Sequence, residues 1–490
     1  MPAEPNLARL AEQAFERHGD YESLWFEGRW FGSGELWDRS CRVAAGLTEA
    51  GVAPGDRVVV LAANCPEVPV LYNAVWRAGA VVTPVIFLLP PAELRHILVD
   101  SEARLVVASP EFIDVVRAAA PKAEVFSTDE LPQADPAPIA ERAGDDLAAL
   151  LYTGGTTGRA KGVMLSHANL WHTGKAAEEA GHVPGIVRGL VPLPLSHSFG
   201  LLVTVVALHT PEPGVTVLMR WFEPTRFLEL VQEHRCQISA VVPSMLQLLL
   251  AQRLEDFDLS SLWYLACGAA PLPREVVAEL GRRLPHVELR EGYGLTETSA
   301  LVSTNPPGRI RLGSVGLPVA DVELRVVDEQ ERALPTGEVG EICCRSPLVM
   351  AGYWRAPELT AEAMRGGWFH TGDLGYLDED GYLYVVDRKK DLIIRGGFNV
   401  FPRDVEDALL EHPAVALAGV VGRPDERHGE EVVAFVALRD GGDVTAEDLL
   451  AFAKERIGGY KYPREVRIVP DVPLTAVGKV DRKALRELVR

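Results

Sequence analysis

The sequence predicts an α/β protein with a large N-terminal domain of helix-covered mixed sheets, a small antiparallel β subdomain and a small α+β C-terminal domain. Three observations lead to this prediction. Helix-like and strand-like stretches alternate through most of the chain, short alternating strands follow at residues 313–345, and a charged segment at 387–391 precedes a further, shorter set of elements. We therefore expect an N-terminal domain of residues 1–389 and a C-terminal domain of residues 390–490.

The composition is that of an ordinary globular protein. Apolar residues make up 47% of the 490 residues, and the formal net charge is −20. A chain this acidic is a poor candidate for holding nucleic acid over a broad surface, because such binding depends on clustered cations. We expect no signal peptide and no transmembrane segment, since the most apolar stretch, residues 199–208, is about half a bilayer span.

The cysteines show neither Cys-x-x-Cys spacing nor partner histidines at metal-finger distances. This pattern indicates reduced thiols in the core of a cytoplasmic protein. The six residues are Cys41, Cys65, Cys236, Cys267, Cys343 and Cys344.

The first 150 residues alternate between the two kinds of periodicity. Apolar spacing predicts helices at 6–17, 36–50 and 67–79, and buried strands at 57–62 and 80–86. Strands separated by helices are typical of a largely parallel sheet with helices on its faces.

A glycine- and threonine-rich stretch, Tyr152–Gly162, follows a predicted strand at 147–151. Glycine lets backbone N–H groups approach phosphate oxygens, while threonine hydroxyls donate and a cation balances charge. The stretch lacks the Gly-Lys pair of a Walker A loop, and the alternative is an ordinary turn between two strands. The candidate phosphate ligands are Thr153, Gly154, Gly155, Thr156, Thr157, Gly158 and Lys161.

Several later strands end in polar or glycine-rich turns, as at the ligand-binding edge of an open sheet. A helix is expected at 165–177 and a strand at 190–196, after which His197 is either a site residue or a core histidine. Between glycines, Tyr293 could present its ring to a base, and Thr296 with Glu297 could reach a phosphate and Mg²⁺. The alternative is a structural tyrosine followed by a helix cap at Thr296.

The C-terminal third offers one further candidate from residue type alone. Asp373, in the turn-like segment 368–375, either caps a turn or binds a ribose diol through both carboxylate oxygens. After the charged break, strands are expected at 415–421 and 432–438 and a helix at 449–457. A lone lysine in the polar tail, Lys479, would ordinarily be a solvated surface residue.

Taken together, these segments resemble the adenylate-forming enzymes, which include acyl-CoA and aryl-CoA synthetases, luciferases and peptide-synthetase adenylation domains. The resemblance covers nearly the whole chain. One such motif would be weak evidence, whereas eight motifs in the family's order are strong evidence. The matching segments are 152–162, 194–200, 268–272, 292–298, 370–374, 387–391, 396–402 and 473–479.

The resemblance implies a two-step reaction that uses ATP, Mg²⁺ and coenzyme A. A carboxylate attacks the α-phosphorus of ATP and expels pyrophosphate, and a thiol then captures the acyl-adenylate. It implies that threonines and Lys161 of the phosphate loop hold the β- and γ-phosphates, that Glu297 positions Mg²⁺ and that Thr296 contacts the α-phosphate. The remaining ATP-binding residues implied are Gly268, Ala269, Ala270, Tyr293, Gly294, Asp373 and Arg388.

The resemblance also implies a mobile C-terminal domain. Lys479 would bridge the carboxylate and the α-phosphate in the first step, with His197 also in the catalytic group. Rotation about a hinge at Lys390 would then replace it with Gly396 and Gly397, which line a channel for coenzyme A.

The acid is expected to be uncharged and apolar, that is, fatty or aryl. The resemblance implies that amino-acid-activating relatives carry an aspartate where this chain has Ser198, and that dicarboxylate-selective ones carry an arginine where it has Trp221. Other readings of the function are a ligase that loads a carrier protein, a nucleotide-binding regulator without turnover, and luciferase-like oxygenation. The possible assembly is a homodimer. The acyl-pocket candidates are His197, Phe199, Trp221, Met245, Gly268 and Gly292.

Overall fold

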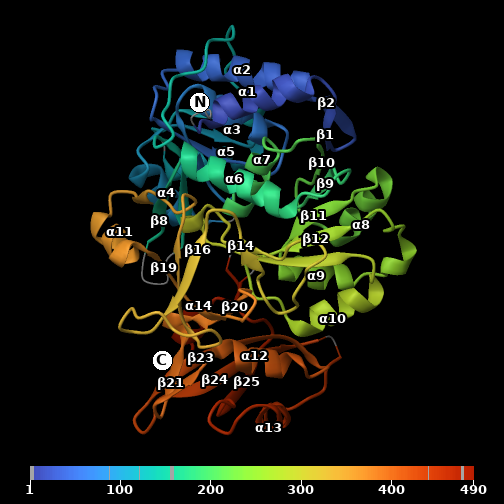
Figure 1. Ribbon diagram of the computed structural model, residues 1–490, viewed down its shortest axis with the longest axis vertical. Coiled ribbons are helices and arrows are strands. Elements are labelled where there is room, and N and C mark those ends of the chain that lie inside the picture. The colour runs from blue at the N-terminus through green and yellow to red at the C-terminus, as the bar shows by residue number, and fades with distance from the viewer. Residues whose placement is uncertain are drawn as a thin grey trace. The chain divides into compact units, whose positions relative to one another are not determined.

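The computed structural model describes residues 5–87, 89–120, 122–154, 159–439, 441–475 and 479–489. The chain forms two compact units, and Figure 1 shows the elements of each. The first unit comprises residues 1–269, 284–323 and 344–369, and the second comprises residues 270–283, 324–343 and 370–490. The domain boundary between residues 389 and 390 stays a prediction.

A seven-stranded sheet in the first unit carries the Gly/Thr-rich segment. Strands β7, β4, β3, β5 and β6 pair in parallel, whereas β8 pairs antiparallel with β7 and with β18. In spatial order the strands are β18 (Gly352–Tyr353), β8 (Lys161–Ser166), β7 (Leu147–Thr153), β4 (Val81–Pro84), β3 (Arg57–Leu61), β5 (Ala103–Ala108) and β6 (Val125–Ser127).

A nine-stranded sheet completes the first unit. Its centre is parallel and its two ends are antiparallel, so both large sheets are mixed, as predicted. In spatial order the strands are β15 (Leu317–Pro318), β14 (Ser303–Thr304), β13 (Glu288–Tyr293), β12 (Tyr264–Cys267), β11 (Ile238–Val241), β9 (Arg188–Val191), β10 (Val215–Leu218), β1 (Glu22–Phe26) and β2 (Arg29–Gly32).

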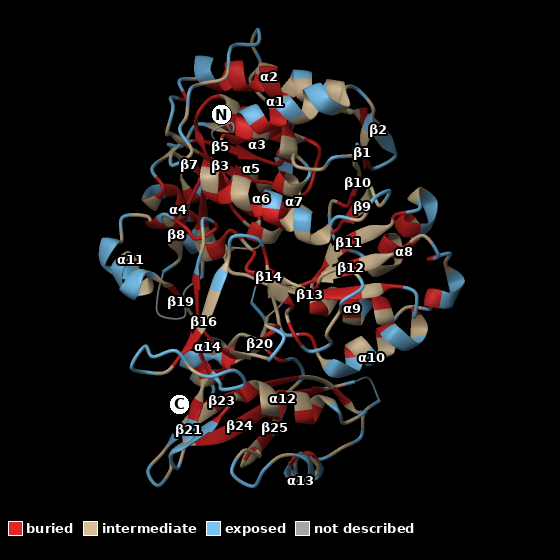
Figure 2. Cartoon of the chain, viewed as in Figure 1, coloured by how far each residue is buried: buried red, intermediate tan, exposed pale blue. Residues whose placement is uncertain are grey.

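Helices alternate with these strands, and the buried residues follow the strands and the inner helix faces (Figure 2). The first helix begins where the Asn6 side chain accepts hydrogen bonds from two backbone N–H groups, a typical N-cap. The helices before residue 300 are α1 (Leu7–His18), α2 (Ser33–Glu49), α3 (Glu67–Arg77), α4 (Pro91–Asp100), α5 (Ile113–Ala119), α6 (His167–Gly181), α7 (Ser198–Val206), α8 (Pro224–His234), α9 (Pro243–Leu250) and α10 (Arg274–Arg283).

Several element predictions were wrong at their bounds, and two of these differences have a clear physical reason. The helix expected at 165–177 begins at His167, because Leu165 and Ser166 belong to β8 and pair with β7, and Ser166 caps the helix. The strand expected at 190–196 is β9, which ends at Val191, before two prolines that cannot donate to a ladder. In both cases tertiary pairing and proline chemistry outweigh apolar periodicity.

The second unit contains two smaller sheets, which confirms the antiparallel subdomain and the α+β C-terminal fold. A four-stranded sheet has the order β16 (Glu323–Val327), β17 (Gly340–Arg345), β19 (Phe369–Leu377) and β20 (Leu383–Arg388). The C-terminal sheet orders β22 (Phe398–Val400), β21 (Ile393–Arg395), β24 (Gly429–Leu438) and β23 (Val415–Asp425), and β25 (Glu465–Ile468) pairs with β24. The remaining helices are α11 (Pro357–Ala363), α12 (Pro402–Leu410), α13 (Ala446–Arg456) and α14 (Arg482–Glu487).

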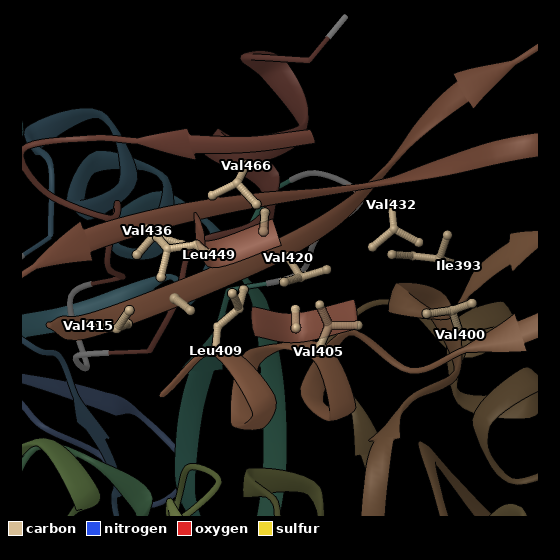
Figure 3. Packing of buried hydrophobic residues seen from close by; sticks show 13 residues of the cluster. Ile393, Val400, Val405, Leu409, Val415, Val420, Val432, Val436, Leu449 and Val466 are labelled. Carbon is tan, nitrogen blue, oxygen red and sulfur yellow. The ribbon is translucent and has the colours of Figure 1, made fainter. Parts of the chain in front are cut away.

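The C-terminal sheet has a core of its own. Valines of β23 and β24 meet Val405 and Leu409 of α12 and Leu449 of α13 (Figure 3). Burying an aliphatic side chain of this size contributes about 1.5–3 kcal/mol. These side chains therefore give residues 393–466 a source of stability that is internal to that segment.

All six cysteines are buried and reduced, as predicted. Among the described residues, no helix combines the length and the apolar character needed to cross a bilayer.

Candidate active site

The Gly/Thr-rich segment joins two antiparallel strands. Thr153 at the end of β7 pairs with Lys161 at the start of β8, and Tyr152 pairs with Gly162. Directly opposed residues project to the same face, so Thr153 and Lys161 are neighbours across the ladder. The two predicted alternatives, an ordinary turn between strands and a phosphate-binding loop, are therefore compatible with this one hairpin. Gly155, Thr156, Thr157 and Gly158 lie outside the described residues.

Lys161 and Glu297 are connected through a tyrosine. The Lys161 Nζ lies 5.3 Å from the centre of the Tyr353 ring, and the Tyr353 hydroxyl donates a 2.9 Å hydrogen bond to Glu297 Oε1. Burial, followed by the neighbouring Glu297 carboxylate, raises the pKa of Tyr353, so the hydroxyl remains a donor at neutral pH. Tyr353 therefore holds Glu297 near Lys161.

Sequence reasoning missed Tyr353. It lies in β18 and pairs with Val163 of β8, two positions beyond Lys161. The only signal in the sequence was a tyrosine after Gly352, which by itself does not distinguish a site residue from a core one.

The turn after β13 brings Thr296 to the segment that carries His197. Thr296 Oγ1 lies 3.4 Å from Ser198 Oγ, at the start of α7. The turn is capped by Thr298, whose hydroxyl accepts from Leu295 N at 2.9 Å, so the predicted alternative of a cap at Thr296 is wrong. This leaves the Thr296 hydroxyl facing a second hydroxyl.

Two features make that turn unusual. A Cβ on Gly294 would lie 2.2 Å from the Ala300 carbonyl oxygen, so this position requires glycine. Ser299 and Ala300 both adopt positive φ, at 53° and 76°. Left-handed backbone at residues other than glycine costs free energy and is concentrated at functional sites.

Three acyl-pocket candidates lie together. A Cβ on Gly268 would be 3.0 Å from the Gly292 carbonyl oxygen and 3.9 Å from Phe199 Cε1. Strands β12 and β13 are adjacent and parallel, which places the two glycines side by side. His197 Nδ1 accepts a hydrogen bond from Phe199 N at 3.2 Å, so His197 caps α7. A side chain at Gly268 would fill space beside the Phe199 ring, whereas one at Gly292 would meet Ser303 and Thr304.

The other two candidates are less closely tied to this group. Trp221 is 43% exposed and makes edge contacts with Phe87 and Phe112, with ring centres 4.9 and 6.4 Å away. Met245 is half-buried in α9. Their place in the acyl pocket stays a prediction.

The ribose candidates belong to the second unit. Asp373 in β19 and Arg388 in β20 are paired across the ladder, and the Arg388 Nε lies 3.1 Å from Asp373 Oδ1. Asp373 is 4% exposed, and its backbone N–H donates to Thr371 Oγ1. A fixed carboxylate with an adjacent guanidinium is suited to a diol next to a phosphate.

The hinge and channel candidates also lie in the second unit. Lys390 occupies the turn 389–391, where burial, followed by the charge of Arg388, lowers its pKa. Gly396 and Gly397 adopt left-handed φ values of 57° and 82°, and Gly396 N donates to the His428 carbonyl at 2.7 Å. Lys479 donates through its backbone N–H to Thr475 Oγ1 at 3.2 Å.

The expected magnesium ligand fits the ion chemically. Mg²⁺ prefers oxygen ligands and is commonly held by one or two carboxylates together with substrate phosphates. Glu297 is partly exposed and directs one carboxylate oxygen to a neutral donor, which leaves the other oxygen available for such a role. Of the adenine candidates, Tyr293 is the last residue of β13, and Ala269 lies two residues after the end of the neighbouring strand β12. Ala270 belongs to the second unit.

Comparisons with known proteins give the family. The model for AMP-binding enzymes matches residues 10–354, and the model for the C-terminal domain of AMP-binding enzymes matches residues 404–479. A feruloyl-CoA synthase from Amycolatopsis sp is 40% identical over 92% of each chain. A long-chain-fatty-acid–CoA ligase from Escherichia coli is 34% identical over 99% of this chain and 95% of that protein.

Solved structures agree with the curated relatives. The ATP-bound MatB from Rhodopseudomonas palustris superposes with a TM-score of 0.90 at 33% identity, over 98% of both chains. The amide bond synthetase McbA from Marinactinospora thermotolerans gives a TM-score of 0.89 at 32% identity, covering 99% of this chain and all of that one.

These matches confirm the predicted enzyme class. The feruloyl-CoA synthase and the long-chain-fatty-acid–CoA ligase are aryl- and acyl-CoA ligases, which are AMP-forming, and ATP and coenzyme A are substrates of that group. The reading as a CoA ligase is thereby favoured over a carrier-loading ligase and over a regulator without turnover. The chain belongs to the AMP-binding enzyme family, within the adenylate-forming superfamily.

Proposed function

We propose that this CoA ligase activates an aryl carboxylic acid, in the presence of Mg²⁺, and transfers the acyl group to coenzyme A. The observation that carries the acid class is the place of Gly268 beside Phe199, where a Cβ would lie 3.9 Å from Phe199 Cε1, so that glycine keeps the space at this ring free of a side chain. An aryl ring packs favourably against another aromatic ring. The 40% identity to a feruloyl-CoA synthase supports an aryl acid over a fatty acid.

The neutral residue at position 198 supports the same class. Ser198 Oγ contacts Thr296 Oγ1, so no carboxylate is present there to pair with a substrate ammonium group. Arg220, the nearest cation to Trp221 in the chain, is engaged by Glu27 at 2.7 and 2.9 Å and stacks on Phe26. A dicarboxylic acid would therefore lack an available partner at Arg220.

The first step requires stabilisation of charge on the triphosphate. Lys161 and the loop hydroxyls would hold the β- and γ-phosphates, and Thr296 would donate to the α-phosphate. A Mg²⁺ ion held by Glu297 would neutralise charge on the departing pyrophosphate. Removing one such preorganised group typically slows a reaction about 100-fold to 1,000-fold.

The remaining roles lie in the second unit. Asp373 would accept both ribose hydroxyls, with Arg388 holding its carboxylate in place. Lys479 would contact the carboxylate and the α-phosphate in the first step only. Rotation at Lys390 would then bring Gly396 and Gly397 to the crevice for the thiol. We retain as further proposals a cytoplasmic location and a homodimer.

Pyrophosphate exchange with a panel of acids tests the proposal. The wild type and the Lys479→Ala variant are assayed with ferulate-like aryl acids, fatty acids of several lengths and malonate, and thioester formation with coenzyme A is then measured. We expect exchange with aryl acids, its loss in Lys479→Ala, and consumption of the adenylate by coenzyme A. Exchange with fatty acids alone would overturn the acid class. Exchange without a CoA thioester would indicate a carrier-protein thiol or an amine as acceptor.

A further inference from the structure

Arg482 is a largely buried cation close to Lys479 in the chain. It lies three residues after Lys479 and is the first residue of α14. Its Nη2 donates to both carboxylate oxygens of Glu406, at 2.8 and 2.7 Å, and its Nη1 lies 3.7 Å from Asp391 Oδ2. The planar guanidinium thus faces two carboxylates through two different nitrogens, which fixes its direction as well as its distance.

Glu406 connects this cation to the core of the C-terminal sheet. It lies in α12, is 8% exposed, and its Oε1 also accepts a 2.9 Å hydrogen bond from Val420 N in β23. Breaking one side of a buried ion pair leaves an uncompensated charge. The start of α14 is thus held firmly against α12 and β23.

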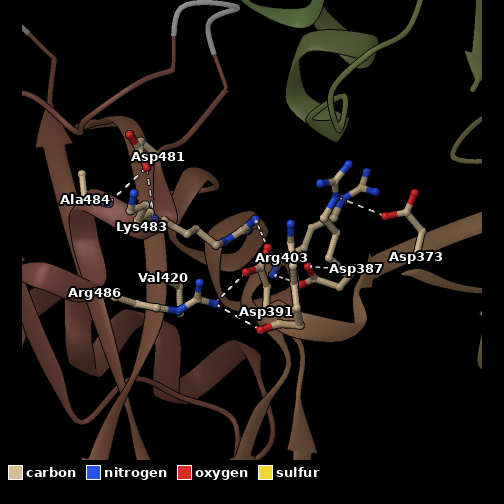
Figure 4. A network of polar contacts seen from close by, with 12 residues as sticks. Asp373, Asp387, Asp391, Arg403, Val420, Asp481, Lys483, Ala484 and Arg486 are labelled. Atoms are coloured by element: carbon tan, nitrogen blue, oxygen red, sulfur yellow. Dashed lines mark hydrogen bonds and ion pairs between the residues drawn. The ribbon is translucent and has the colours of Figure 1, made fainter. Parts of the chain in front are cut away.

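Asp391 connects the same helix to the turn that contains Lys390. Its Oδ1 lies 2.6 Å from Nη2 of Arg486, which also donates to the Lys390 carbonyl at 3.4 Å; Figure 4 shows Arg486 directed at Asp391. Arg482 and Arg486 are four residues apart on one helix and so share a face. Both therefore hold the turn 389–391 against α14.

The segment that carries Lys479 leads directly into this clamp. Thr475 N donates to the Lys479 carbonyl at 2.7 Å, Leu474 bridges to Val480, and Asp481 N donates to the Pro473 carbonyl at 2.8 Å. Asp481 also caps α14 by accepting from two backbone N–H groups. The backbone between Lys479 and Arg482 has little freedom to move independently of the helix.

We propose that Arg482 is a positioning residue for Lys479, acting through its contacts with Glu406 and Asp391. These contacts fix the backbone at residues 479–481 relative to the turn 389–391, about which the C-terminal domain would rotate. The inference rests on the function proposed above, in which Lys479 acts in adenylation only. Adenylation therefore depends on Arg482, whereas thioester formation from an acyl-adenylate does not.

The test separates the two half-reactions. Arg482→Lys keeps the charge but loses the planar guanidinium that faces Glu406 and Asp391 through two different nitrogens, and Glu406→Gln removes the acceptor charge but keeps an oxygen for Val420 N. For each variant, pyrophosphate exchange and the conversion of supplied acyl-adenylate to a thioester are measured. Because a misplacement of about 1 Å costs about 100-fold, we expect kcat for exchange to fall about 10-fold to 100-fold. The KM for ATP and the thioester rate should stay within about twofold.

A matched control lies on the same domain. Arg423 in β23 pairs with Glu465 of β25 and not with Asp391 or Glu406, and Arg423→Lys should leave both half-reactions unchanged. A parallel fall of both half-reactions in the Arg482 and Glu406 variants, or no fall in either, would overturn the inference. If Arg482→Lys fails to fold, Arg486→Gln, which leaves Arg482 in place, should lower exchange in the same direction. An unchanged exchange rate in that variant would also count against it.

The failure of the proposed function gives a different result. If the wild type lacks exchange with every acid, the function itself fails. If both the wild type and Lys479→Ala catalyse exchange, the proposed role of Lys479 is wrong, and the inference about Arg482 is wrong with it.

Discussion

At the scale of single residues, Tyr353 is the contact through which Glu297 is held. Removing its hydroxyl in Tyr353→Phe deletes a 2.9 Å hydrogen bond to a carboxylate. Hydrogen bonds to charged groups contribute about 1.5–3 kcal/mol, so we expect pyrophosphate exchange at saturating ATP to fall about tenfold or more. If Tyr353 acts by positioning Glu297, the variant should also need a higher Mg²⁺ concentration to reach half of its maximal exchange rate.

Tyr384→Phe is the matched control. Its hydroxyl donates at 3.4 Å to Asp378 in the turn between β19 and β20, so its loss should leave exchange within about twofold. Equal rates for wild type and Tyr353→Phe would show that Glu297 needs no such support.

A second residue-scale prediction concerns pH. Burial lowers the pKa of His167 to about 4, and its Nδ1 accepts a hydrogen bond from Leu7 N at 3.2 Å. Below pH 6.5 the unfolded chain takes up a proton that the folded chain refuses, so stability present above pH 6.5 is lost as the pH falls toward 4. Between pH 8 and pH 5 this group removes about 2 kcal/mol.

Denaturant unfolding of wild type and His167→Gln at several pH values measures this loss. The variant is less stable at pH 8, because Leu7 N loses its acceptor geometry, but its free energy of unfolding should fall less on acidification. His209, whose pKa is also lowered to about 4, is present in both proteins, so its contribution cancels when their free energies of unfolding are compared. Parallel curves would contradict the assignment.

At the scale of elements, α7 depends on a glycine that no periodicity indicates. A Cβ on Gly200 would lie 2.2 Å from the Pro194 carbonyl oxygen, a backbone atom that cannot move aside cheaply. Gly200→Ala should cost about 3 kcal/mol and impair exchange, because α7 carries Phe199 and follows His197. Thermal unfolding and the exchange assay measure the two effects.

Gly281 provides the comparison. It also lies within a helix, α10, but a Cβ there would meet no atom within 4 Å. Gly281→Ala should stabilise the protein by about 0.5–1 kcal/mol through helix propensity. Similar effects at both glycines would show that packing on Pro194 does not determine the difference.

At the scale of the whole molecule, the C-terminal core predicts independent folding. The side chains in Figure 3 all come from residues 393–466. A fragment of residues 390–490 should therefore unfold cooperatively in urea with the circular dichroism of an α+β fold. It should be less stable than in the intact chain, because Arg403 N loses the Asp387 carboxylate, 3.0 Å away. A fragment without a cooperative transition would contradict the boundary predicted at residue 390.

The family, the mixed-sheet fold and the enzyme class followed from the sequence alone. Glycines, threonines and carboxylates at strand ends are local features, and their order along the chain is specific. The apolar periodicity also located α1, α3 and β3 within one or two residues. Local chemistry was sufficient wherever the structure depends on the residue itself and on its nearest neighbours.

Only the tertiary structure decided which distant residues meet. The pairing of β8 with β7 and β18 brought Tyr353 beside Lys161, and the packing of α14 on β23 brought Arg482 to Glu406 and Asp391. Such contacts depend on strand register and helix packing, which sum weak interactions over many residues and leave no local signature. The sequence therefore determined what chemistry this protein carries, and the fold determined which side chains position it.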